Sequence, residues 1–64
     1  MSQEEFEIHL LAFLKKEGGL VLYEAIAQWK LRHPEFSGCS TEKALKSLES
    51  KGLVELTDRG AKAK

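Results

Sequence analysis

The fold of this chain is decided by residues 40–60, which read STEKALKSLESKGLVELTDRG. Ser40 is typical of a helix N-cap, because its hydroxyl accepts a backbone N–H that the first helical turn leaves unpaired. Apolar residues then recur at helical spacing and predict one buried face, made of Ala44, Leu45 and Leu48. The pattern therefore predicts a helix over about residues 40–52, with its opposite face turned to solvent.

The residues after this helix predict a turn and one strand. Gly52 supplies the left-handed residue that ends the helix. Leu53 follows at the position where a Schellman motif packs an apolar residue back against the helix. Residues 54–57 alternate between apolar and polar side chains, which is typical of a short strand. We expect residues 57–60 to form a turn and residues 61–64 to form a small basic tail.

A first helix is predicted near the start of the chain. Ser2 and Glu5 have the spacing of a capping box, in which the hydroxyl accepts a backbone N–H and the carboxylate reaches back to the cap. One helical face is apolar up to the helix end at Gly18, and consists of Phe6, Leu10, Phe13 and Leu14. Ile8 and Leu11 form a second apolar stripe, which is either part of a broad buried face or a partner surface.

A second helix is predicted over about residues 23–32. It carries apolar residues at helical spacing, namely Leu22, Ala25, Ile26 and Trp29. Pro34 ends it, because a proline pushes the residue before it out of the helical region. The apolar residues 20–22 form either a short strand or the lead-in to this helix. In the long turn that follows, over residues 33–39, we expect Phe36 to be buried.

Length and composition narrow the class of protein. The 64 residues make one domain, residues 1–64, with a thin core and little room for a buried catalytic cleft. No nucleophile with an adjacent base is evident, so an enzyme is not expected. No apolar run reaches the roughly 20 residues of a membrane span, and the acidic start differs from a signal peptide. The single cysteine favours a cytoplasmic or nuclear location.

The net charge is zero, but the charges are unevenly distributed. Residues 1–29 carry five Glu against two Lys, whereas residues 30–64 carry eight Lys or Arg against five acidic residues. A neutral chain is not expected to bind nucleic acid strongly through charge alone. Any positive field lies in the second half of the chain, which also contains the helix over residues 40–52.

Residues 40–60 resemble the recognition helix and first wing strand of MarR-like and PadR-like DNA-binding regulators. The shared pattern is a helix with leucines three residues apart, the sequence Lys-Gly-Leu-Val at residues 51–54, and a Thr and a Gly at the following turn. The resemblance covers about a third of the chain and implies a mainly α (α+β) fold, a three-helix winged helix-turn-helix with a short β-wing. Whether a second wing strand forms stays open. The match stops before the dimerisation helix of those regulators, so the oligomeric state stays open too.

A fainter resemblance connects the chain with LOTUS domains of RNA-regulatory proteins. It rests on Gly18 and Gly19, followed by the apolar residues 20–22 before a long second helix. This resemblance implies an RNA-associated module as an alternative to a DNA-binding one.

The winged-helix resemblance implies that the third helix enters the major groove of DNA in transcription regulation. Short hydroxyls and lysines suit contacts to phosphates and base edges. The predicted nucleic-acid-binding residues are Ser40, Lys43, Lys46, Ser47, Ser50, Arg59 and Lys62. The predicted third helix has no arginine for bidentate contact to guanine, so we do not expect sharp sequence specificity.

The alternative hypothesis is a protein-docking module with the same fold. Its surface would be the acidic first helix with Ile8 and Leu11, and its partner would be another protein or a second copy. No membrane partner, cofactor or metal is expected, because the histidines and Cys39 lack metal-ligand spacing. We expect Cys39 to be a small apolar residue in the turn, and Tyr23 to be the one aromatic residue loosely suited to stack on a base.

Overall fold

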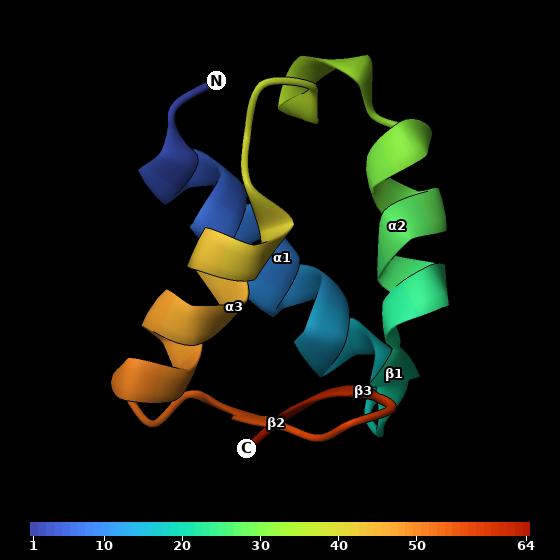
Figure 1. Ribbon diagram of the computed structural model, residues 1–64, viewed down its shortest axis with the longest axis vertical. Coiled ribbons are helices and arrows are strands. Elements are labelled where there is room, and N and C mark those ends of the chain that lie inside the picture. The colour runs from blue at the N-terminus through green and yellow to red at the C-terminus, as the bar shows by residue number, and fades with distance from the viewer.

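Three α-helices and a small antiparallel sheet form the fold in the computed structural model, which describes residues 1–64. In chain order the elements are α1 (Gln3–Glu17), β1 (Val21–Leu22), α2 (Tyr23–Leu31), a 3₁₀ turn (Pro34–Phe36), α3 (Thr41–Ser50), β2 (Val54–Leu56) and β3 (Gly60–Ala63). The sheet lies at one end of the molecule, close to where α2 begins and α3 ends (Figure 1). The predicted mainly α class, with three helices and a small β part, is confirmed.

The ends of α3 are fixed by its own residues. Ser40 caps the start, where its Oγ accepts a hydrogen bond from the backbone N–H of Lys43 at 3.2 Å. At the other end Gly52 has a φ of 75° and donates to the carbonyl of Glu49 at 2.9 Å. Leu53 donates to the carbonyl of Leu48 at 3.0 Å, which completes the hydrogen bonds of the predicted Schellman motif.

The start of α1 forms a capping contact that differs in one detail from the expected one. The Oγ of Ser2 accepts from the backbone N–H of Glu5 at 3.1 Å, as predicted. The carboxylate of Glu5 accepts from the Ser2 hydroxyl at 3.2 Å instead of reaching the backbone N–H of the cap. The helix ends where Gly18 donates to the carbonyl of Leu14.

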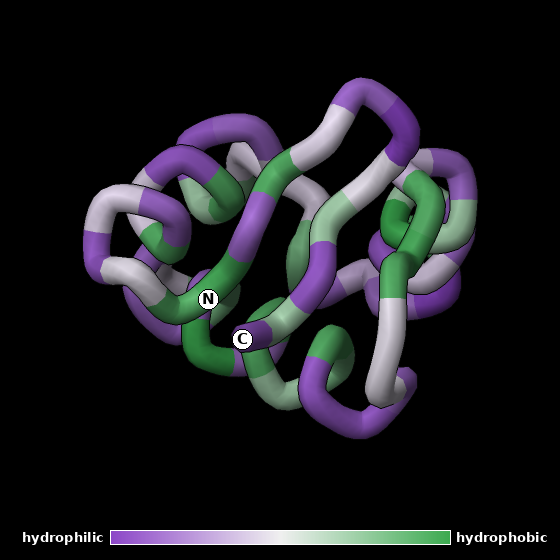
Figure 2. The backbone as a smooth tube through the Cα atoms, turned by 90° about the horizontal axis from the view of Figure 1, so that it is seen from below, coloured by the Kyte–Doolittle hydropathy of each residue, from purple (hydrophilic) through white to green (hydrophobic).

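The predicted basic tail is β3, the central strand of the sheet. The strand order is β1-β3-β2, and both pairings are antiparallel. Ala61 lies opposite Val21 on one side and Leu56 on the other. The sequence predicted a basic tail here and left open whether a second strand forms after the turn. The strand does form, because pairing on both edges stabilises a Gly-Ala-Lys-Ala segment with weak strand propensity. The pairing also identifies Val21–Leu22 as a strand, one of the two alternatives for this segment. Figure 2 shows the two hairpin strands running side by side to a hydrophilic turn.

The close approach of β1 and β3 depends on a glycine. Gly60 lies opposite Leu22 in the register. A Cβ at Gly60 would clash with the backbone carbonyl of Val21. Any other residue here would push the two strands apart, so the sheet requires glycine at this position.

The core gathers one face of each helix and the inner face of the sheet. Of the apolar residues predicted at helical spacing, those buried in the core are Phe6, Leu10, Leu14, Ile26, Ala44, Leu45 and Leu48. Leu22 and Ala25 are exposed. Phe13 and Trp29 are only half-buried at its edge. Phe36 is buried as expected, and Cys39 is a buried free thiol. None of the helices has the length and apolar character required to cross a membrane.

Replacing Leu48 by Ala is expected to lower the free energy of unfolding by about 2–5 kcal/mol, the range for truncating a buried leucine. Leu48 is 2% exposed, whereas Leu31 on α2 is 75% exposed and provides the matched control. Leu31→Ala should change stability by no more than about 0.5 kcal/mol. Thermal melts followed by circular dichroism compare the two variants. Equal melting of Leu48→Ala and the parent would contradict the assignment of the buried face of α3.

Candidate nucleic-acid interface

The outer face of α3 carries three of the predicted contact residues. Because its apolar residues turn inward, Lys43, Lys46 and Ser50 are left exposed on the opposite side of the helix. These side chains can therefore meet a ligand without any rearrangement of the core.

The two lysines of this face differ in their surroundings. The Nζ of Lys46 lies 3.0 Å from Oε1 of Glu42 one helical turn earlier, and both side chains are largely exposed. Such an exposed pair contributes little to stability, so a phosphate can compete with the carboxylate for the ammonium group. Lys43 forms no ion pair. The face thus offers one free cation and one that is weakly held.

Two predicted contact residues, Ser40 and Ser47, are half-buried and form hydrogen bonds inside the protein. The Oγ of Ser40 caps α3, while its backbone N–H and carbonyl bond the side-chain amide of Gln3 at 2.9 and 2.8 Å. The hydroxyl of Ser47 donates to Oε1 of Glu7 at 3.0 Å. An external contact by either hydroxyl would compete with these bonds. The sequence pattern of α3 alone does not reveal these internal hydrogen bonds.

Glu7 is the centre of a polar contact between α1 and α3. Its side chain is 11% exposed, and Oε1 also accepts from Nζ of Lys51 at 2.6 Å. The hydrogen bond from Lys51 lowers the pKa of Glu7, and the Ser47 hydroxyl adds to this effect, whereas burial opposes it. The carboxylate therefore stays ionised and connects the two helices.

The hairpin turn supplies the remaining predicted residues. Arg59 is exposed in the turn between β2 and β3 and forms no ion pair. Lys62 is exposed on β3, where the pairing places Glu55 of β2 directly opposite. The neighbouring carboxylate offsets the charge of Lys62. Arg59 is therefore the stronger candidate for a phosphate contact.

A depression of about 350 Å³ separates the outer face of α3 from the hairpin. It is lined by Tyr23, Thr41, Glu42, Leu45, Lys46 and Leu56. The hydroxyl of Tyr23 donates to the backbone carbonyl of Thr57 in the hairpin turn. The sequence singled out Tyr23 only for base stacking. Its contact with Thr57 could not be predicted, because that contact depends on the pairing of β3.

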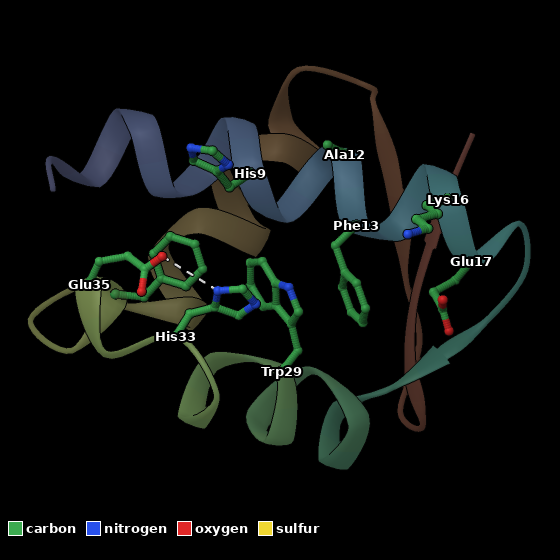
Figure 3. Close-up of a pocket in the computed structure, with 9 residues that line it drawn as sticks. His9, Ala12, Phe13, Lys16, Glu17, Trp29, His33 and Glu35 are labelled. Atoms are coloured by element: carbon green, nitrogen blue, oxygen red, sulfur yellow. Dashed lines mark ion pairs between the residues drawn. The ribbon is translucent and has the colours of Figure 1, made fainter.

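A second groove, of about 520 Å³, lies between α1 and α2 (Figure 3). Phe13 and Trp29 stack across it with ring centroids 4.8 Å apart. Nδ1 of His33 lies 3.5 Å from a carboxylate oxygen of Glu35, and the His33 ring packs on Phe36. His9 also packs on Phe36, and no three His, Cys, Asp or Glu side chains come together as a metal site requires. The sequence patterns placed Phe13, Trp29 and Phe36 among the apolar residues of the fold, but they did not predict a groove between α1 and α2.

The predicted contact residues thus fall into two groups. The exposed ones are Lys43, Lys46, Ser50, Arg59 and Lys62, and the internally bonded ones are Ser40 and Ser47. Among the predicted contact residues, the exposed group can contact a ligand without breaking an internal hydrogen bond.

No protein-family model, curated protein or solved structure matches the chain.

The contact at Glu7 predicts how stability responds to pH. Because the folded-state pKa lies below the ordinary value of 4.5, the contact stabilises the protein above that value. This contribution is lost as the pH falls through the folded-state pKa. Glu7→Gln should cost about 1–3 kcal/mol at pH 7 and should flatten the pH dependence.

Urea unfolding at pH 7 and pH 3 measures this effect. The control is Glu49→Gln, since Glu49 is exposed on α3 and forms no ion pair. This control should keep the parent's loss of stability at low pH. Identical pH dependence of Glu7→Gln and the parent would show that the carboxylate does not connect the helices.

Proposed function

We propose that the chain is a non-enzymatic winged-helix domain that binds duplex DNA. In this proposal α3 enters the major groove and the hairpin of β2 and β3 contacts the phosphate backbone. The observation that carries it is the free outer face of α3, where Lys43, Lys46 and Ser50 are exposed. An α-helix with such a face has the size that the major groove of B-DNA admits.

The order of the elements supports the winged-helix assignment. A strand separates α1 from α2, and a two-stranded hairpin follows α3. This order agrees with the resemblance of residues 40–60 to MarR-like and PadR-like regulators, and the hairpin corresponds to the wing. A role in transcription regulation inside the cell is part of the same proposal.

The chemistry of the exposed residues favours backbone contacts over base recognition. Ammonium groups bind phosphates as point charges, and the Ser50 hydroxyl can donate to or accept from a phosphate or base edge. α3 has no arginine to bind guanine through two hydrogen bonds. Only a few cations face the ligand on a chain of zero net charge. The expected binding is therefore modest in affinity, weakly sequence-specific and dependent on salt.

Protein docking through α1 is the second candidate function. Ile8 is 68% exposed on α1, which leaves an apolar side chain available to a partner or a second copy. Leu11 packs partly against the core, so the apolar surface is narrower than the two-residue stripe expected from the sequence.

Replacing Lys43 and Lys46 together by Ala is expected to weaken duplex binding. The salt dependence should lose roughly one unit of slope for each phosphate contact removed. The charge-matched control is the replacement of both Lys15 and Lys16 by Ala. These two residues are exposed in the last turn of α1. This control should bind nearly as the parent does.

Fluorescence anisotropy with labelled duplex DNA, single-stranded DNA and RNA, at about 50 and 200 mM salt, measures the binding. Equal weakening by both lysine pairs would indicate a general charge effect and contradict an interface on α3. Stronger binding to RNA than to duplex DNA would favour the LOTUS-like alternative. Duplex binding unaffected by the α3 variant, with a partner or second copy lost in Ile8→Ser, would favour docking.

A further inference from the structure

The hairpin turn is held by a dense set of hydrogen bonds within only four residues. The backbone N–H of Thr57 donates to the carbonyl of Gly60 at 2.8 Å. The Oγ1 of Thr57 accepts from the backbone N–H groups of Arg59 and Gly60 at 3.1 and 3.0 Å. Because these bonds fix the backbone around Arg59, its side chain projects from a defined position.

The same turn is attached to the start of α2 by one residue. The backbone N–H of Tyr23 donates to the carbonyl of Arg59 at 3.2 Å. Its hydroxyl donates to the carbonyl of Thr57. Tyr23 thus bonds two carbonyls of the turn at once. Tyr23 is 38% exposed, so the core does not require an aromatic residue here.

Tyr23 also faces the outer side of α3 across a depression. It lines the depression that Lys46 and Leu56 border from the other elements. Tyr23 therefore holds the backbone at Arg59 on the hairpin side of this depression. Holding a cation in place before binding lowers the entropy that is lost when it contacts a phosphate.

We propose that Tyr23 is a positioning residue that holds Arg59 for contact with a phosphodiester group of the duplex. This inference rests on the proposed DNA-binding function. The guanidinium of Arg59 is exposed and unpaired. Its planar array of donors matches two phosphate oxygens. Tyr23 itself bonds the hairpin turn and not the DNA, so its effect on DNA binding is exerted through Arg59.

The test is a double-mutant cycle measured as duplex affinity by fluorescence anisotropy. Tyr23→Phe keeps the ring and removes the hydroxyl that bonds Thr57, and is expected to weaken binding about twofold to tenfold. In the background of Arg59→Ala the same change should have almost no further effect, because the positioned side chain is gone. In the background of Lys43→Ala it should keep its full effect, since Lys43 lies on α3 and not in the hairpin turn.

A second variant addresses the turn from its own side. Thr57→Val removes the Oγ1 acceptor of Arg59 and Gly60 and should show the same dependence on Arg59. A general loss of folding would weaken binding equally in the Arg59→Ala and Lys43→Ala backgrounds, and this outcome would overturn the proposal. Parent-like affinity of Tyr23→Phe or of Arg59→Ala would overturn it as well.

These outcomes separate the inference from the proposed function. If Lys43→Ala weakens duplex binding while Tyr23→Phe does not, α3 binds DNA and the positioning role is wrong. If the parent has no salt-dependent affinity for the duplex, the proposed function fails, and the positioning role fails with it.

Discussion

The structure depends on the insertion of β3 between β1 and β2. Ala61 pairs across to Val21 and Leu56, so one short strand joins two segments that are 35 residues apart in the sequence. Without it, the backbone groups facing β3 from both outer strands would be unpaired, at a cost comparable to lost hydrogen bonds. Gly60 makes the insertion sterically possible. The pairing also brings the hairpin turn to the start of α2, where Tyr23 meets it.

The orientation of α3 depends on polar contacts with α1 as well as on apolar packing. The amide of Gln3 bonds the backbone of Ser40 at the start of α3, and Glu7 bonds Ser47 and Lys51 further along it. Apolar contacts are not directional, whereas these hydrogen bonds are satisfied in only one rotation of α3 about its axis. They therefore select which side of α3 faces solvent.

Sequence patterns predicted the features that depend on local chemistry. The cap at Ser40 and the left-handed Gly52 act within one helical turn, so the limits of α3 could be found from neighbouring residues. Whether β3 forms could not be decided from the local pattern, because its stability comes from partners distant in sequence. The inward contact of Ser47 was missed for a related reason, since it lies at the border of the apolar face and the position of α1 decides its environment. The exposed lysines of α3 could be predicted because they lie opposite the leucines.

The stacking of Phe13 and Trp29 across the groove between α1 and α2 has an optical consequence. Trp29 is the only tryptophan of the chain and is half-buried, with Phe6, Phe13, His33 and Phe36 around its indole ring. Its emission therefore reports whether α1 and α2 are docked. The groove lies away from the outer face of α3, so this intrinsic signal monitors unfolding independently of any ligand held there.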